Sequence, residues 1–295
     1  MTIGAPREGA VVAVVGAFDG YHRDHAHLVS TAHRLAAEQR VPLAAVVIDN
    51  PGPRVVLPVE RRCRHLREAG AASVAVVDEE VPADELARWE GLATVVGADV
   101  SQVAVLAGPS LRGGGSSPAT LRAAPTGHGH TVVEVPRVPD ASGMVASSER
   151  VRDAVAAGDM ELAGRLLGRP FSVLREVVVG NQIGRTIGVP TANLAPDPRA
   201  VAPARGVYAA IVVLPDGSRW PAAANVGVRP TVDDAGELRI EAHLIGFDGD
   251  LYGQEIDVAL TTRLRDERRF ESLDDLKAQL AMDIRQAADT IAGTT

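Results

Sequence analysis

The residues best suited to chemistry lie between Val179 and Leu194. This stretch holds three glycines, Arg185, Pro190 and the run Thr191-Ala192-Asn193. Glycine lets main-chain N–H groups turn toward a bound anion without a Cβ in the way, and an arginine adds a fixed positive fork. We therefore predict a shaped loop, with no regular helix or strand, that holds phosphate. The predicted nucleotide-binding residues are Gly180, Gly184, Arg185, Gly188, Thr191 and Asn193.

Thr191 and Asn193 also form a candidate metal site. They offer a hydroxyl and an amide oxygen on the same side of an extended segment. Oxygen ligands of this kind suit a hard divalent cation that carries a nucleotide, so we predict that both residues bind Mg²⁺ together with ATP. On these residues alone, a glycine-rich hairpin loop without a ligand remains the alternative.

Further motifs follow at short intervals and identify a family. They are Gly206-Val207-Tyr208-Ala209, the run from Ala224 to Thr231, and the run from Glu241 to Gly253. Together with Pro190-Thr191-Ala192-Asn193, they resemble riboflavin kinase in the form that makes the C-terminal half of bacterial bifunctional riboflavin kinase/FAD synthetases. The resemblance covers roughly residues 170 to 292.

The resemblance implies transfer of the ATP γ-phosphoryl group to the ribityl 5′-hydroxyl of riboflavin, which gives FMN. Glu241 alternates with apolar neighbours on a predicted strand, so its side chain should point away from the side of Ile240 and Ala242. The matching glutamate is the catalytic base of the family. By resemblance alone, Asn225 and Arg229 lie near the nucleotide or the flavin.

The N-terminal half carries a second candidate site. An apolar run from Val11 to Val15 reads as a buried strand, and the turn Gly16 to His25 leads from it into an amphipathic helix. In a parallel α/β sheet such a turn usually holds a nucleotide phosphate. These residues resemble the adenylyltransferase half of the same family, whose pattern is Gly-x-Phe-Asp-Gly-x-His-x-Gly-His. In that family the histidines hold the ATP phosphates while AMP is transferred to FMN.

Two acidic residues break this resemblance. Asp24 stands where the family has glycine, and Glu149 replaces a threonine in the segment from Ala146 to Arg152. A carboxylate at about 4 Å from a phosphate charge costs on the order of 4 kcal/mol at an effective dielectric near 20. We therefore predict that the fold survives and that adenylyltransferase activity is weak or absent. The residues of this degenerate site are Gly16, Phe18, Asp19, His22, Asp24, His25, Ser147, Ser148, Glu149 and Arg152.

Three other functions remain open. The chain could be a fully bifunctional riboflavin kinase/FAD synthetase, a kinase that acts on a riboflavin analogue, or a non-catalytic flavin-binding or regulatory protein. The last is disfavoured by Thr191, Asn193 and Glu241, because binding alone needs neither a metal pair nor a base.

The pattern of elements predicts two domains that position these residues. Residues 1–168 alternate apolar strands with helices and should form a nucleotidyltransferase-like parallel sheet. Residues 169–295 show five strand-like segments and a final helix that begins at Ser272. The resemblance implies a closed barrel of six antiparallel strands. The apolar stripe Leu273, Leu276, Leu280, Ile284 and Ile291 should pack this helix on the barrel.

Composition sets the remaining limits. The 295 residues carry a net charge of −8 and no concentrated basic face, which argues against a nucleic-acid partner. Cys63 is the single cysteine, and we expect a partly buried thiol on a helix there. No segment approaches the length of a membrane span, so a cytoplasmic enzyme with small-molecule substrates is expected. The sequence makes no prediction about oligomeric state.

Overall fold

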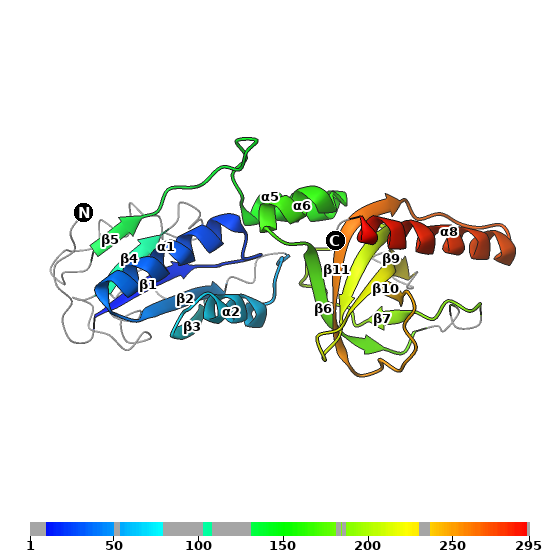
Figure 1. The fold of residues 1–295 in the computed structure, drawn as a ribbon, viewed down its shortest axis with the longest axis horizontal. Helices are drawn as coiled ribbons and strands as arrows, with labels where there is room; N and C mark the ends of the chain where they lie inside the picture. The colour runs from blue at the N-terminus through cyan, green and yellow to red at the C-terminus, as the bar shows by residue number, and fades with distance from the viewer. Residues whose placement is uncertain are drawn as a thin grey trace. The chain divides into compact units, whose positions relative to one another are not determined.

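The structure is a computed structural model that describes residues 10–49, 54–78, 103–107, 131–180, 184, 187–229 and 237–293 (Figure 1). Internal contacts divide the chain into two units, Met1–Glu149 and Arg150–Thr295. This division falls before the boundary expected after residue 168. The reason is packing, because α5 (Ser148–Ala157) starts at the division and α6 (Met160–Leu167) packs on strands of the second unit.

The first unit is a parallel sheet built on β1 (Val11–Gly16), which is buried along its whole length. The strand order is β3-β2-β1-β4-β5, and every pairing is parallel, which confirms the predicted α/β class. β5 has only 4 residues, too few for its pattern to stand out in the sequence. The other strands are β2 (Leu43–Asp49), β3 (Ser73–Asp78), β4 (Val103–Ala107) and β5 (Thr131–Glu134), and the helices are α1 (Arg23–Gln39) and α2 (Val59–Glu68).

This strand order places the first candidate site. The chain builds outward from β1 to β2 and β3, and then returns to the other side of β1 with β4 and β5. Ligands of open α/β sheets bind beyond the carboxyl ends of the strands where the order reverses in this way. The turn between β1 and α1 lies at such a point.

The second unit is a closed barrel with the strand order β10-β7-β6-β11-β8-β9, which confirms the six antiparallel strands expected. Small buried side chains, including Ala222, Ala224 and Ala242, line its inner faces. The strands are β6 (Phe171–Val178), β7 (Ala192–Leu194), β8 (Gly206–Val213), β9 (Arg219–Arg229), β10 (Glu237–Leu244) and β11 (Glu255–Arg265).

β7 corrects one expectation. The glycine-rich stretch was expected to hold no strand, yet its last residues form β7 between β6 and β10. Three residues suffice because both edges of β7 are paired, and Pro190 leads into the strand already extended.

The final helix, α8 (Leu273–Ala292), packs on the barrel along a face that only partly coincides with the predicted stripe. Its fully buried residues are Asp283 and Ala287, whereas Leu273 is 52% exposed and the remaining members of the predicted stripe are only partly buried. An ion pair also anchors this helix to the barrel. Nε and Nη2 of Arg265 on β11 donate to the two carboxylate oxygens of Asp283 at 2.9 and 2.7 Å. No helix among the described residues is long and apolar enough to cross a bilayer.

The Arg265–Asp283 pair gives a stability prediction. Asp283 is 1% exposed, so Asp283→Asn should leave the Arg265 guanidinium without its counter-charge and lower the free energy of unfolding. The expected loss is about 3 kcal/mol, as for other broken buried ion pairs. Urea denaturation followed by far-UV circular dichroism measures it. Asp274→Asn in the exposed first turn of the same helix is the control, and an equal loss there would contradict the assignment.

Candidate functional site

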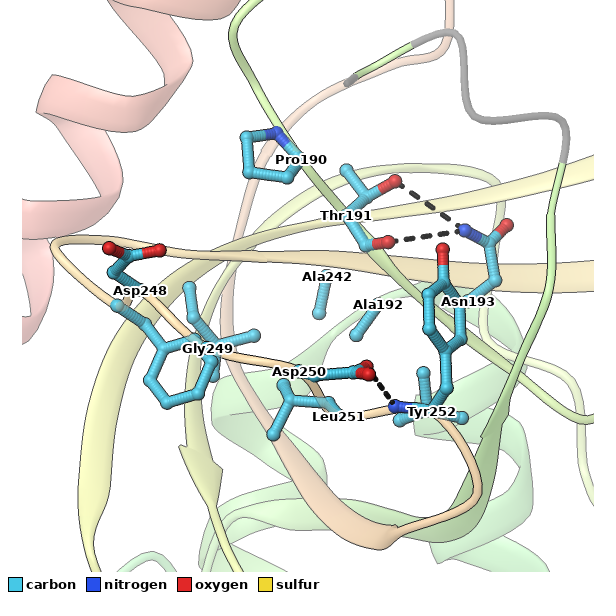
Figure 2. A pocket seen from close by; sticks show the side chains of 13 residues that line it. Pro190, Thr191, Ala192, Asn193, Ala242, Asp248, Gly249, Asp250, Leu251 and Tyr252 are labelled. Atoms are coloured by element: carbon cyan, nitrogen blue, oxygen red, sulfur yellow. Dashed lines mark hydrogen bonds between the residues drawn. The ribbon is translucent and has the colours of Figure 1, made fainter.

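A cavity of about 530 Å³ opens beside β7 and β10 of the barrel (Figure 2). One wall is the buried face of these strands, with Ala192, Ala242 and Leu244. The segment from Phe247 to Tyr252 forms the opposite wall, and the Asp250 carboxylate braces it by accepting the Tyr252 amide at 3.0 Å. Cavities of this volume are typical of small-molecule sites.

Thr191 and Asn193 lie together at the edge of this cavity, as the sequence predicts for a shared metal and phosphate site. The Asn193 amide nitrogen donates to the Thr191 carbonyl oxygen at 3.3 Å and lies 3.5 Å from the Thr191 hydroxyl. Asn193 is 7% exposed, and its Oδ1 is buried without a hydrogen-bond partner. A buried acceptor left unmatched is costly, so this oxygen beside a hydroxyl fits a hard cation.

Gly180 makes room for this arrangement. A Cβ added to Gly180 would overlap the Asn193 side-chain amide well inside van der Waals contact. Gly184 has a different role, because its carbonyl accepts the amides of Ile187 and Val189 at 3.2 and 2.8 Å and so closes a turn. Gly188 adopts φ = 82°, which glycine tolerates best. Arg185 lies outside the described residues.

Glu241 lies on the outer face of β10. Its register partners are Asn193 on β7 and Asn225 on β9, so the three side chains share one face. Ile240 and Ala242 are buried on the other face, as the alternation predicts. Burial raises the pKa of Glu241, and Arg239 partly opposes this shift. A raised pKa brings a carboxylate closer to the range in which a general base works well.

The cavity and Glu241 therefore lie on opposite faces of the same strand. Within the described residues, Glu241 does not line the cavity, and Asn193 is the residue common to both places. His243 shares the outer face, and its Nδ1 lies 2.8 Å from the Pro190 carbonyl oxygen, so it supports the approach to Thr191. Arg229 lies in β9, but its side chain is outside the described residues.

In the first unit, the turn between β1 and α1 has unusual backbone geometry. Phe18 and Tyr21 adopt φ values of 51° and 40°, on either side of Gly20 at 78°. Non-glycine residues rarely hold such angles unless their surroundings impose them, and such residues cluster at functional sites. Gly16 ends β1 just before this turn, and His22 caps α1 with its ring nitrogen.

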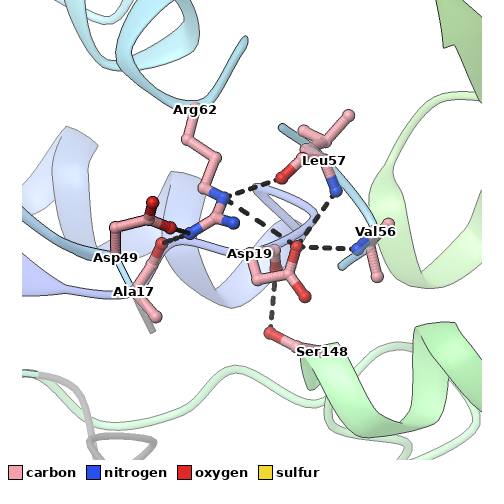
Figure 3. A network of polar contacts seen from close by, with 7 residues as sticks. All are labelled: Ala17, Asp19, Asp49, Val56, Leu57, Arg62 and Ser148. Atoms are coloured by element: carbon pink, nitrogen blue, oxygen red, sulfur yellow. Dashed lines mark hydrogen bonds and ion pairs between the residues drawn. The ribbon is translucent and has the colours of Figure 1, made fainter. Parts of the chain in front are cut away.

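A buried polar network imposes this geometry (Figure 3). The Asp19 carboxylate accepts the amides of Val56 and Leu57 at 2.8 and 3.0 Å. The Arg62 side chain is 2% exposed, and its Nη1 lies 3.4 Å from the Asp49 carboxylate. The Ser148 hydroxyl donates to the Asp19 main-chain oxygen at 2.8 Å. Asp19 thus ties the turn to the chain before α2 and to the start of α5.

The two histidines of the motif meet in this turn. The rings of His22 and His25 stack with their centroids 3.7 Å apart, and the ring centroid of Phe18 lies 5.3 Å from that of His25. Burial lowers the pKa of His25 well below its usual value, and repulsion from His22, Arg62 and Arg137 adds to this effect. His25 is therefore neutral at neutral pH, and its buried Nδ1 makes no hydrogen bond among the described residues.

The two acidic substitutions have different surroundings. The Asp24 side chain is only 9% exposed, and burial raises the pKa of its carboxyl group. Glu149 is exposed in the first turn of α5, near Ser147, Ser148 and Arg152 in the sequence. A helix N-terminus favours negative charge, and water screens the charge of an exposed carboxylate. Glu149 should therefore disturb a bound phosphate less than Asp24 does.

Sequence reasoning missed two arginines near this turn. Arg62 shares the buried side of α2 with Cys63 and Leu66. Their helical spacing in the sequence could have indicated that Arg62 is buried. Cys63 lies on a helix as predicted and is buried, and burial raises its pKa despite the neighbouring arginines. Arg137 gave no signal because it lies in an irregular segment after β5.

Comparison with known proteins covers both units. A family described as riboflavin kinase matches residues 167–291, and one described as FAD synthetase matches residues 5–149. The chain is 36% identical to a bifunctional riboflavin kinase/FMN adenylyltransferase of Pseudomonas fluorescens, over 96% of this chain and 93% of that protein. It is 32% identical to the protein of that name from Escherichia coli K12, over 95% and 92% of the two chains.

A solved structure is also similar. It is that of a Streptococcus pneumoniae protein described as a macrolide-efflux protein, with a TM-score of 0.79 and 31% identity over 96% of this chain and 95% of that one.

The packing of Gly180 on Asn193 gives a prediction for the barrel site. Gly180→Ala should displace the Asn193 amide and slow phosphoryl transfer to riboflavin at least tenfold, or about 1.4 kcal/mol in the barrier. Steady-state kinetics with varied MgATP measures the effect. Gly164→Ala in α6 is the matched control, because the added methyl meets only one carbonyl oxygen at 3.7 Å. Equal rates for both variants would show that Asn193 is not held by Gly180.

Proposed function

The chain belongs to the bifunctional riboflavin kinase/FMN adenylyltransferase family, and we propose that its barrel unit converts riboflavin to FMN with ATP while its N-terminal unit adenylylates FMN only weakly. The observation that carries the kinase assignment is the shared position of Asn193. This residue lines the cavity on one side and is the register partner of Glu241 on the other.

We place ATP in the cavity with its phosphates at Thr191 and Asn193. The unmatched Oδ1 of Asn193 and the hydroxyl of Thr191 would hold Mg²⁺, which when bound neutralises phosphate charge. We assign Gly180, Gly184 and Gly188 to the phosphates, because glycine lets main-chain N–H groups turn toward an anion, and we assign Arg185 to the same task.

Riboflavin then approaches from the side of Glu241. Asn225 lies on this face as the register partner of Glu241, which favours the flavin over the nucleotide as its neighbour, and we assign Arg229 of the same strand likewise. Glu241 accepts the proton of the ribityl 5′-hydroxyl while the hydroxyl oxygen attacks the γ-phosphorus, and the bond from the γ-phosphorus to the β–γ bridging oxygen breaks to release ADP. The rest of the catalysis is positioning and charge neutralisation, as in other phosphoryl transfers.

The weakness that we propose for adenylyl transfer rests on Asp24. Asp24 stands where the family has glycine, at the start of α1 and one residue before His25. The phosphates of a second ATP would bind there. Neutral His25 adds no positive charge to offset the Asp24 carboxylate. A fully bifunctional enzyme is the second candidate. It is favoured because the turn, the histidine stack and the Asp19 network are all formed.

Substitution of the base tests the kinase assignment. Glu241→Gln should lower the rate of FMN formation by at least about a hundredfold, the usual contribution of a general base, and leave riboflavin affinity nearly unchanged. Because burial raises the pKa of Glu241, the wild-type rate should fall on acidification at a higher pH than for an exposed glutamate. The variant should lose this acid limb. A near-normal rate would show that another group takes the proton.

The same variant tests the burial of Glu241 independently of the reaction. Because folding raises the pKa of Glu241, the folded state favours the protonated carboxyl group. The free energy of unfolding is therefore highest below the pKa that Glu241 has in the unfolded chain, and it falls as pH rises through the folded-state pKa. Glu241→Gln should therefore melt higher than wild type at neutral pH and equally below about pH 4. Glu255→Gln, at an exposed position of β11, should change neither melting curve.

Restoring the family residue tests the adenylyltransferase assignment. Asp24→Gly should raise the rate of FAD formation from FMN and MgATP at least tenfold, since relief of about 1.4 kcal/mol is well within the repulsion expected at this site. Glu149→Thr should have a smaller effect because Glu149 is exposed. If neither substitution raises the rate, the acidic residues are tolerated and the bifunctional candidate is the better one.

A further inference from the structure

The Asp24 carboxyl group is buried, and burial disfavours its ionised form unless positive charge lies nearby. Its side chain is 9% exposed, and neither carboxylate oxygen makes a hydrogen bond among the described residues. The main-chain amide of Val138 lowers the pKa of Asp24, but by less than burial raises it. The partial positive charge at the start of α1 helps, but a helix terminus alone contributes only about 0.3–1 kcal/mol.

Arg137 supplies the missing charge. Its Nε lies 3.8 Å from Oδ2 of Asp24, and its side chain reaches α1 from the segment that joins β5 to α5. The Arg137 charge also contributes to the lowered pKa of His25, after burial and the charges of His22 and Arg62.

Other basic groups contribute less to Asp24, and His27 lowers the pKa of its carboxyl group less than Arg137 does. Arg62 donates to the main-chain oxygens of Leu57 and Ala17 and pairs with Asp49, so its charge is committed to the buried network (Figure 3). His25 is neutral. Among these groups, Arg137 is the one that pairs with Asp24 through its side chain.

We propose that Arg137 is a charge-compensating positioning residue of the N-terminal nucleotide site, which offsets Asp24 so that the start of α1 can still accept the triphosphate of MgATP. The inference rests on the proposed function of the N-terminal unit and adds to it the reason why the activity is weak and not abolished. Without Arg137, one uncompensated negative charge would face the phosphates. With it, the pair is neutral, and the partial positive charge at the N-terminus of α1 still favours an anion.

A double-mutant cycle in the full-length chain tests this proposal. Every protein carries Asn193→Ala to remove ATP binding at the barrel site, so that calorimetric titration with MgATP, without flavin, reports on the N-terminal unit. The proteins compared are the parent, Arg137→Met, Arg137→Lys, Asp24→Asn and the Arg137→Met/Asp24→Asn double variant. Arg34→Met is the matched control for loss of one positive charge, because Arg34 is exposed on α1, the helix that carries Asp24.

We expect the effect of Arg137→Met on MgATP affinity to depend on whether Asp24 is present. Arg137→Met should weaken MgATP binding at least about tenfold alone but less than about threefold when Asp24→Asn is also present. Arg137→Lys should keep most of the affinity because the charge is retained, and Arg34→Met should change nothing. The melting temperature of each protein is recorded, because a purely structural role for Arg137 would alter stability without this dependence on Asp24.

Two results would overturn the proposal. One is an equal loss of MgATP affinity on Arg137→Met with and without Asp24→Asn, which would make Arg137 a direct or structural contact and not a compensating charge. The other is the absence of MgATP binding to the N-terminal unit in all the proteins. That second result would leave the kinase assignment intact, since FMN formation by the chain with native Asn193 tests it separately.

Discussion

The register between β7 and β10 is the constraint on which the barrel site depends. It sets Asn193 opposite Glu241, and the next pair, Ala192 and Ala242, faces the cavity. Because side chains alternate along a strand, a slip of one residue would move Glu241 to the buried face and an alanine to the outer one. Pairing of β7 on both edges, with β6 and β10, guards against such a slip in a strand of only 3 residues.

A comparable constraint shapes the first unit. The Asp19 carboxylate, the buried Arg62 and the Ser148 hydroxyl hold the chain before α2 and the start of α5 against the turn after β1. These ties preserve the strained turn and the histidine stack even though Asp24 changes the charge beside them. Architecture and chemistry can therefore diverge in this unit, because the groups that maintain the turn are not the groups that would meet the phosphates.

The sequence was sufficient for the fold class and for the side of β10 on which Glu241 lies, because both follow from hydrophobic periodicity. It was also sufficient to bring Thr191 and Asn193 together, since residues two apart in an extended segment share a side. It could not show that the cavity lies on the opposite face from Glu241, because the cavity wall comes from the segment around Asp250 and Tyr252, distant in the chain. Nor could it show that Asp283 is among the most buried residues of α8, because its pairing with Arg265 is a tertiary contact. Contacts such as Arg137 with Asp24 are set by tertiary structure and leave no local pattern.

The most direct test of the account is a time course of flavin products. The purified chain is incubated with riboflavin, ATP and Mg²⁺, and riboflavin, FMN and FAD are separated by chromatography. The account predicts that FMN accumulates first and that FAD follows much more slowly. Absence of FMN would contradict the kinase assignment, and FAD that keeps pace with FMN would contradict the view that Asp24 weakens the N-terminal site.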